Sequence, residues 1–467
     1  RMAQVHLPRS LLPMVDDQES LAVDGATAGE VLTRLQARYP RLAGWVLDER
    51  GALRQHVALF RDGQKIETDA ALGEGDSLHV VQAISGGAPQ DRMRAAPGAG
   101  GGDDLELLVS TRKGLVVLRG PRDGELEVAC RCFEGQAVEY ALRDPATGAY
   151  LAAVTHGHYG PRIFRSDDVT AGEEAWEQTA GPAFPEDTGA AVERIWALEV
   201  GVAPGELWAG VAPAALFRSG DGGRSWELVR SLWDEPSRPS WEPGGGGLCL
   251  HSICPWPGDP DRLAVGVSAA GVWITEDGCR TWEWGGAGLV PRYLPEDARE
   301  GAKMLCVHAM KRAPREPETL YMQFHGGVYL SEDAGRTWSD IAAGLPSDFG
   351  FPLVIDPRDP GRAFVLPLVA DVDRVTPEGR VQVWETTDRG ATWRARSNGL
   401  PSEGAFLTIL RQAFCGDARD PLGLYFGATS GEVFGSADGG ASWRTLARRL
   451  PPVLSVRVTG AVDSRRP

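Results

Sequence analysis

Short apolar runs separated by polar turns recur along most of the chain. In the clearest case, the apolar run 327–330 is followed by the turn Ser331-Glu332-Asp333-Ala334-Gly335 and then by Trp338. An apolar run, a polar turn and a large aromatic residue predict two strands joined by a tight hairpin. In such a turn the aspartate accepts hydrogen bonds from backbone N–H groups, and the glycine supplies a positive φ.

The same phrase recurs at a nearly constant spacing. Its tryptophans are Trp176, Trp226, Trp282, Trp338, Trp393 and Trp443, which lie 50, 56, 56, 55 and 50 residues apart. The corresponding aspartates are Asp168, Asp221, Asp277, Asp333, Asp388 and Asp438. Cys279 replaces the glycine in one copy, and the copy at Asp168 carries an insertion. A period of this size predicts solenoid units or propeller blades.

One apolar phrase in each unit aligns as the third strand of a four-stranded blade. These phrases are residues 114–117, 162–164, 215–218, 271–274, 327–330, 381–384 and 431–434. Seven units over residues 103–458 give about 51 residues each, which is typical of a blade. We also expect the run 454–458 to pair with the first unit and close the ring. The prediction is an all-β propeller over residues 103–467, seven-bladed, with six blades as the alternative because the first two turns are degenerate.

The repeated phrase is that of the Asp box, or BNR repeat, and residues 103–467 resemble the BNR/sialidase-like propellers. The resemblance implies a structural role for the six aspartates. It does not predict an activity, because such repeats occur in glycosidases, sorting receptors and assembly factors. The segment 160–164 does not match the Phe-Arg-Ile-Pro phrase of sialidases, and their arginine triad cannot be assembled.

We therefore expect the propeller to be a non-catalytic scaffold that binds a protein or small-molecule ligand. The alternative is a glycosidase-like or metal-dependent hydrolase, docked by the first domain. A glycosidase needs paired carboxylates facing a cleft. Candidates in long loops between blades are Glu186, Asp187, Glu296 and Asp297.

Residues 2–87 follow a different pattern. The alternating segments 4–7 and 20–23 predict a hairpin, and Thr27 with Glu30 forms a capping-box signature at the start of a helix that ends at Tyr39-Pro40. Strands are predicted at 57–60 and 77–81. Two strands, a helix and two further strands in under 90 residues predict a small α+β fold, the β-grasp or ubiquitin-like fold.

This domain ends at Ser85-Gly86-Gly87. With this ending and the strand before it, residues 2–87 resemble the ThiS/MoaD sulfur carriers. In that family the carboxylate of the last glycine is adenylated by a partner enzyme and converted to a thiocarboxylate. The resemblance implies that Gly87 is the acyl carrier, that Gly86 is its flexible neighbour, and that an E1-like adenylating enzyme is a partner.

The chain departs from that family because Ala88 follows Gly87. A free carboxylate at Gly87 therefore requires a processing protease, unless the domain has become a fixed docking module. Residues 88–102 hold two prolines, four glycines and four alanines and predict a flexible linker.

Composition limits the partners and the cellular compartment that we expect for the chain. A net charge of −16 disfavours nucleic acid and anionic membranes as partners. No apolar run approaches the ~18 residues of a spanning helix, and the first 25 residues lack the apolar core of a signal peptide. The seven cysteines form no CxxC pair, so we expect reduced thiols in a cytoplasmic protein.

Cysteine and histidine recur together one repeat apart, as Cys249-Leu250-His251 and Cys306-Val307-His308. Both pairs fall on predicted innermost strands, where residues two apart share a face. The turns expected at the same end of the blades carry the remaining candidates, His156, His158 and His325. Thiolate and imidazole suit zinc or copper in the propeller channel. The alternative is that these residues only pack the channel.

Overall fold

The computed structural model describes residues 2–54, 57–82, 104–370 and 373–459. The chain divides into two compact units. One holds the N-terminal sheet together with segments Thr155–Arg162 and Ala183–Glu193, and the other holds the rest of the described chain. The predicted domain limits at residues 87 and 103 lie at the edges of a stretch outside the described residues, so they stay predictions.

The N-terminal sheet has five strands in the order β2-β1-β5-β3-β4. Their bounds are β1 Met2–His6, β2 Leu21–Asp24, β3 Val57–Arg61, β4 Gln64–Ile66 and β5 Ser77–Gln82, and the helices are η1 Arg9–Val15, α1 Ala28–Arg38 and η2 Pro40–Leu42. β1 and β5 are parallel in the middle of the sheet, and the other pairs are antiparallel. This is a small ubiquitin-like domain, as expected.

The helix α1 begins where the capping box predicts. Thr27 Oγ1 accepts a hydrogen bond from the backbone N–H of Glu30 (3.3 Å), and the Glu30 carboxylate accepts one from the N–H of Ala26 (2.9 Å). The helix ends at Arg38, directly before Tyr39-Pro40. Its buried face carries Val31, Leu32 and Leu35, which pack with the apolar side chains of the sheet.

The rest of the described chain forms seven four-stranded sheets. Their strands are β6 Asp104–Thr111, β7 Gly114–Pro121 and β8 Glu127–Cys132 with β33 Val453–Val458; β9 Ala137–Arg143, β10 Tyr150–His156, β11 Gly160–Ser166 and β12 Glu177–Gln178; β13 Arg194–Val200, β14 Leu207–Ala212, β15 Ala215–Ser219 and β16 Glu227–Leu228; β17 Cys249–Trp256, β18 Asp259–Ser268, β19 Gly271–Thr275 and β20 Glu283–Trp284; β21 Val307–Arg312, β22 Leu320–Phe324, β23 Gly327–Ser331 and β24 Ser339–Asp340; β25 Gly350–Ile355, β26 Ala363–Pro367, β27 Val383–Thr386 and β28 Arg394–Arg396; and β29 Phe414–Gly416, β30 Leu424–Gly427, β31 Val433–Ser436 and β32 Arg444–Ala447. Each predicted third-strand phrase overlaps the third strand of one of these sheets.

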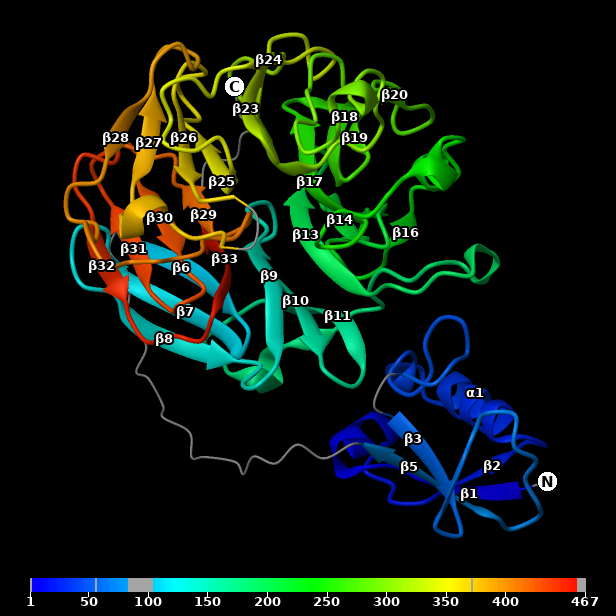
Figure 1. Cartoon of the computed structure of the whole chain (residues 1–467). Helices are drawn as coiled ribbons and strands as arrows, with labels where there is room; N and C mark the ends of the chain where they lie inside the picture. Colours follow the sequence, from blue (N-terminus) through cyan, green and yellow to red (C-terminus); the bar gives the residue numbers. More distant parts are fainter. Residues whose placement is uncertain (1, 55–56, 83–103, 371–372, 460–467) are drawn as a thin grey trace. The chain divides into compact units, whose positions relative to one another are not determined.

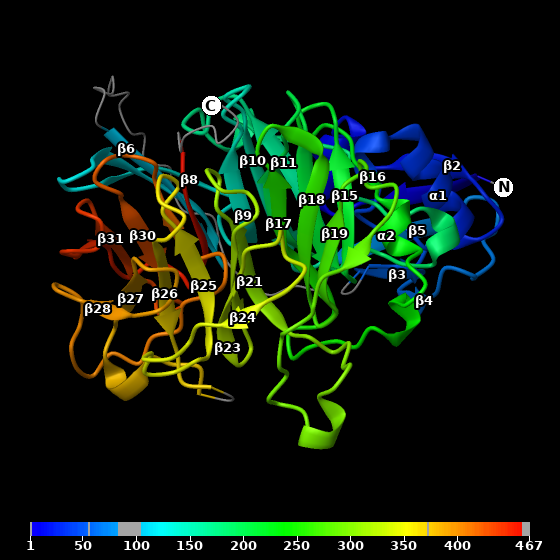
Figure 2. The ribbon, with the colours of Figure 1, turned by 90° about the horizontal axis from the view of Figure 1, so that it is seen from above.

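Short helices lie in the connections between strands: η3 Glu173–Ala175, η4 Glu186–Thr188, α2 Arg230–Trp233, η5 Arg238–Ser240, η6 Glu296–Ala298 and η7 Pro377–Gly379. The loop that carries η6 extends away from the sheets (Figure 2). Glu186, Asp187, Glu296 and Asp297 are all exposed on η4 and η6, so each acidic pair lies in solvent.

The seven sheets follow one another around a common centre, with β13, β17, β25 and β29 on the inner side (Figure 1). First strands of successive sheets pack side by side, and β33 packs beside both β29 and β9. β33 also pairs with β6, with Val456 opposite Val109, as the sequence predicted. Strands such as β22 and β23 are buried at every position because sheets cover both of their faces. The arrangement is that of a β-propeller.

The repeated aspartate turns follow the third strand in six of the seven sheets, all except the sheet that contains β6, β7 and β8. At the representative turn, Asp333 Oδ1 accepts hydrogen bonds from the Thr337 N–H (2.8 Å) and the Ser331 hydroxyl (2.8 Å), and Oδ2 accepts one from the Thr337 hydroxyl (2.6 Å). Asp221, Asp277, Asp388 and Asp438 repeat these three contacts. Cys279 takes a φ of 66° where the other four turns have glycine. Asp168 differs, since its Oδ1 accepts from the N–H and hydroxyl of Thr170.

All seven cysteines are free thiols, and five of them are buried. Among the described residues, no helix has the length and apolar character that crossing a bilayer requires.

Candidate functional site

The predicted carrier residues Gly86 and Gly87 lie outside the described residues. The strand that leads to them is β5, which ends at Gln82, five residues before Gly87. β5 lies between β1 and β3 and is therefore hydrogen-bonded on both sides. The role of the two glycines stays a prediction.

Both Cys-x-His phrases lie at the start of an innermost strand. β17 begins at Cys249, and β21 begins at Val307, directly after Cys306. The pairing register shifts at His251, between Leu250 and Ser252, and again at His308, between Val307 and Ala309. A bulge of this kind re-aims the side chain of the extra residue. His251 and His308 therefore occupy equivalent positions in neighbouring sheets.

The two histidines nevertheless make different hydrogen bonds. The His251 ring uses both nitrogens, because Nε2 lies 2.8 Å from the carbonyl oxygen of Val307 and Nδ1 lies 3.0 Å from the Ser252 hydroxyl. The His308 ring places Nδ1 2.7 Å from the carbonyl oxygen of Gly350. A carbonyl only accepts, so His308 Nδ1 carries the proton and its lone pair is on Nε2.

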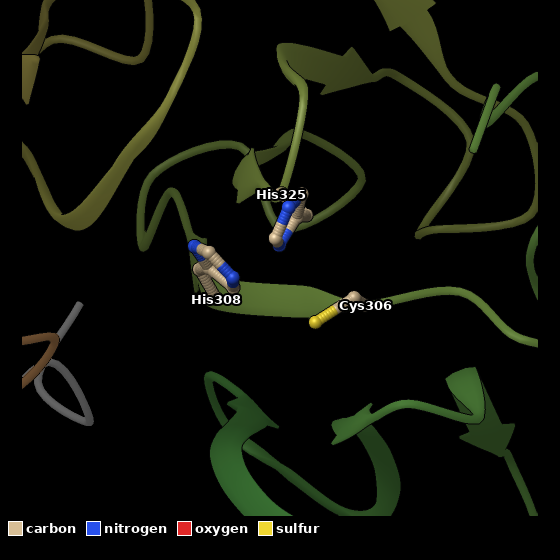
Figure 3. Close-up of side chains that lie close together, drawn as sticks. All are labelled: Cys306, His308 and His325. Atoms are coloured by element: carbon tan, nitrogen blue, oxygen red, sulfur yellow. The ribbon is translucent and has the colours of Figure 1, made fainter. Parts of the chain in front are cut away.

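The third member of the site is His325, in the turn between β22 and β23. Cys306 lies directly before β21, His308 projects from β21, and His325 projects toward them from the turn (Figure 3). One ligand atom from each of Cys306, His308 and His325 lies within 4.8 Å of the other two. The turn is held in place by a hydrogen bond from the His325 N–H to the Cys306 carbonyl oxygen (3.1 Å).

Tyr293 connects the same two elements. Its hydroxyl accepts a hydrogen bond from the Cys306 N–H (2.8 Å) and donates one to the Met304 carbonyl (2.8 Å). Its ring lies edge-on to the His325 ring, with 4.8 Å between the centroids. Tyr293 thus positions both the cysteine and the histidine of the turn.

The site is buried, and burial decides its protonation. Cys306 is 8% exposed and His308 4% exposed, whereas His325 is half-buried. Burial, and then the charge of Arg411, hold the pKa of His308 well below its usual value, so the imidazole is neutral at pH 7. Burial raises the pKa of the Cys306 thiol. A metal ion would reverse that preference by binding the thiolate and releasing its proton.

Arg411 brings positive charge to these innermost strands. Its Nη1 lies 3.8 Å from Cys249 Sγ, and its guanidinium lies 4.8 Å from the ring centroid of Trp196 and 5.8 Å from that of Phe351. The same charge acts on Cys306, together with the charge of Arg374. A positive environment of this kind favours a bound anion.

Gly244, the first of four consecutive glycines, lies against the site. A Cβ atom on Gly244 would lie 3.0 Å from Ser268 Oγ and 3.5 Å from Cys306 Sγ, and one on Gly246 would lie 3.7 Å from Trp196. The Ser268 hydroxyl itself lies 3.3 Å from Cys306 Sγ. Gly244 therefore brings bare backbone close to the cysteine.

The structure does not place the other predicted candidates in this group of ligand atoms. Cys249 and His251 lie one sheet away, with the contacts given above. His156 lies at the end of β10, and the N–H of His158 donates a hydrogen bond to its Nδ1 (3.1 Å). The aspartates of the repeated turns direct their carboxylates at their own turns. Tyr293, Arg411, Arg374 and the glycine run were not singled out from the sequence, although four consecutive glycines were a usable signal.

Comparison with known proteins identifies the first domain. The family model of the ThiS family matches residues 5–87. The domain is 34% identical over 68 residues to small archaeal modifier protein 3 of Haloferax volcanii, a match that covers 14% of this chain and 73% of that protein. The N-terminal domain belongs to the ThiS family. This ThiS-family domain is also 27% identical over 89 residues to the sulfur carrier protein CysO of Mycobacterium tuberculosis, covering 18% of this chain and 96% of CysO.

A longer match covers half of the chain. The oligoxyloglucan-reducing end-specific xyloglucanase of Emericella nidulans is 23% identical over 270 residues, covering 51% of this chain. The match spans only about a third (32%) of that enzyme. Among solved structures, an ancestral GH74 enzyme has a TM-score of 0.46 at 17% identity, covering 66% of this chain and 38% of its own.

Proposed function

We propose that the chain is the precursor of a ThiS-type sulfur carrier, fused through a linker to a propeller that binds a partner. The observation that carries this proposal is the family match, which ends at Gly87 while the chain continues with Ala88. A carrier of this class needs a free carboxylate at its last glycine. The carrier is therefore activated only after a protease cuts between Gly87 and Ala88.

The chemistry proceeds in three balanced steps. Water hydrolyses the amide between Gly87 and Ala88, leaving a Gly87 carboxylate and a new amino terminus on the linker. An E1-like enzyme then transfers AMP from ATP to that carboxylate and releases pyrophosphate. Hydrosulfide displaces AMP from the acyl adenylate and leaves a thiocarboxylate. Glycines suit this end of the chain, because no side chain obstructs its entry into a partner's active site.

The propeller serves in this proposal as a non-catalytic binding scaffold in the cytoplasm. Its seven sheets are seven blades of a closed ring, supported by the pairing of β33 with β6 and by the packing of successive first strands. The repeated aspartates are Asp boxes that stabilise turns, which their hydrogen bonds within each turn support. The domain limits are residues 2–87, a linker over 88–102, and the propeller over 103–467.

The proposal is tested by measuring the intact mass of the protein from the cells that produce it. The expected product is a fragment ending at Gly87, with a second form heavier by the difference between a sulfur and an oxygen atom. A Gly87→Val variant, which places a branched side chain next to the cut, is expected to stay uncut. An uncut chain in the wild type, with no thiocarboxylate form under sulfur limitation, would exclude the carrier function.

The xyloglucanase match supports a second candidate function, a glycosidase-like propeller docked by the first domain. Retaining and inverting glycosidases need two carboxyl groups about 5–10 Å apart across a cleft. The exposed pairs on η4 and η6 do not provide that setting. The test is release of reducing ends from xyloglucan oligosaccharides by the full chain, with Glu186→Gln and Glu296→Gln variants alongside. No release by the wild type would remove this candidate.

A further inference from the structure

We propose that Cys306, His308 and His325 bind one zinc-class divalent metal ion, whose fourth position takes a small carboxylate-class anion beside Arg411. Three protein ligands and one exchangeable position are typical of zinc sites that act on a bound ligand rather than only holding a fold.

The donor set and its spacing favour this metal class. One thiolate and two imidazoles form a borderline-soft set that suits zinc. In a tetrahedral site with bonds of about 2.0–2.3 Å, ligand atoms lie about 3.4–3.8 Å apart. The three ligand atoms already lie within 4.8 Å of one another, so closing around an ion requires side-chain shifts of about 1 Å.

The hydrogen-bond partners of the three ligand residues are of the kind that orient ligands in metal sites. His308 donates through Nδ1 to the Gly350 carbonyl, which directs the Nε2 lone pair outward as a ligand. Tyr293 and the His325 N–H hold the backbone of Cys306. All three ligands come from the same repeat: Cys306 directly precedes β21, His308 lies in β21, and His325 lies in the turn after β22.

Repetition explains the Cys-x-His phrase but not the third ligand. The neighbouring sheet carries Cys249 and His251, yet its turn between β18 and β19 has Ala269 where the next sheet has His325. The His251 ring is also committed to hydrogen bonds at both nitrogens. The third ligand, His325, therefore occurs in the same repeat as His308, the histidine that has a lone pair on Nε2.

The charge around the site indicates what fills the fourth position. A divalent ion with one thiolate carries a net charge of +1, and Arg411 adds a further positive charge against Cys249. A monoanion would neutralise the +1 charge of the metal–thiolate unit, and Gly244 leaves backbone rather than a side chain beside Cys306. Any carboxylate or thiocarboxylate group has this chemistry. The Gly87 terminus is one such group, and that source alone rests on the proposed function.

Metal binding is tested on the full chain after chelator treatment, by titration with Co²⁺ and then displacement by Zn²⁺. We expect about one equivalent of cobalt, tetrahedral d–d bands and a thiolate-to-cobalt charge-transfer band. His325→Ala reproduces the residue of the neighbouring repeat, so it should fold and bind metal about 100-fold more weakly. Cys306→Ser should lose the charge-transfer band. The matched controls Cys249→Ser and His251→Gln should bind metal as the wild type does.

Three results would overturn the metal site: no cobalt binding by the wild type, bands without thiolate character, or equal affinity in His325→Ala. Near-UV circular dichroism checks that each variant is folded, and the wild-type spectrum and His325→Ala decide the matter if Cys306→Ser does not fold. None of these measurements depends on cleavage after Gly87.

The anion is tested on the cobalt form with acetate and thioacetate. Both should shift the d–d bands, and Arg411→Gln should weaken that binding about tenfold while cobalt affinity holds. Tighter binding of thioacetate supports a thiocarboxylate as the natural ligand, and tighter binding of acetate supports a carboxylate. Bands that neither anion shifts would overturn the fourth-ligand assignment.

Discussion

Replacing Asp333 by alanine tests whether the repeated aspartates act through their own turns. The carboxylate accepts three hydrogen bonds, two at Oδ1 and one at Oδ2. It thereby ties the end of β23 to Thr337, next to the buried ring of Trp338, which is 4% exposed. The indole N–H of Trp338 donates to the carbonyls of Gly285 and Gly335, so the turn also holds two neighbouring sheets together.

The magnitude follows from these contacts. A hydrogen bond to a charged group contributes about 1.5–3 kcal/mol when buried. Asp333 is only half-buried, so water replaces part of what is lost. The variant also leaves the buried Ser331 hydroxyl without its acceptor, although that hydroxyl still accepts from the Gly335 N–H (2.9 Å). We expect Asp333→Ala to lower the free energy of unfolding by about 2–3 kcal/mol.

The assay is urea unfolding at pH 7 followed by tryptophan fluorescence. Asp333→Asn keeps one oxygen acceptor without the charge and should cost about 1 kcal/mol. The matched control is Glu332→Ala, one residue away in the same turn. Glu332 is largely exposed, and its ion pair with Arg389 (3.2 Å) should contribute less than about 0.5 kcal/mol.

The decisive result is the order of the losses in unfolding free energy, which should be largest for Asp333→Ala, smaller for Asp333→Asn and smallest for Glu332→Ala. If Asp333→Ala unfolds at the same urea concentration as Glu332→Ala, the carboxylate does not stabilise the turn. A double-mutant cycle with Thr337→Val adds a second measure. Its coupling energy should be about 1 kcal/mol, and a coupling of zero would show that the 2.6 Å contact contributes nothing.

Three further predictions follow from the structure. Hydrogen bonds from Thr281 hold the pKa of Asp277 at about 2, below the value of about 3.9 in unfolded chains. Its contribution is thus present above about pH 4 and lost as the pH falls toward 2. In acid titrations followed by near-UV circular dichroism, an unfolding midpoint that Asp277→Asn leaves unchanged would contradict this. Thr27→Ala removes the cap of α1 and should cost about 1 kcal/mol in thermal unfolding, whereas an unaltered melting curve would show that the cap is unimportant. Val456→Asp places a charge at a fully buried position of β33 and should cause aggregation on size-exclusion chromatography, and a well-folded variant would argue against ring closure by β33.

Local chemistry explains what the sequence could predict. The capping box at Thr27 and the turn at Asp333 are settled by side chains within five residues of one another, so both are readable from the sequence. Six of the seven third strands were readable because each of them lies directly before such a turn. β4 was not predicted, since its three residues, Gln64–Ile66, have no buried position and no alternating pattern.

The site was harder to predict because its geometry depends on distant residues. The spacing of Cys306 and His308 predicted a shared face, and their ligand atoms do lie within 4.8 Å of one another, but the bulge at His308 and the hydrogen bond to the Gly350 carbonyl were not readable from the sequence. Arg411 is about a hundred residues further along the chain, and its contact with Cys249 Sγ (3.8 Å) depends on the ring order of the sheets. The net charge of −16 gave no hint of a positive site, because net charge describes the whole surface and not one buried location.

The comparison of His251 with His308 shows where sequence similarity stops being informative about chemistry. The two residues share a phrase, a strand position and a bulge, and both give a ring nitrogen to a carbonyl of the following sheet. His251 gives Nε2 to Val307, and Ser252 occupies the other nitrogen, whereas His308 gives Nδ1 to Gly350. Which nitrogen is used follows from where the next sheet places its carbonyl. Neighbouring repeats can therefore contain the same pair of candidate ligand residues. The position of the carbonyl in the following sheet then determines which histidine has a nitrogen available to bind a metal.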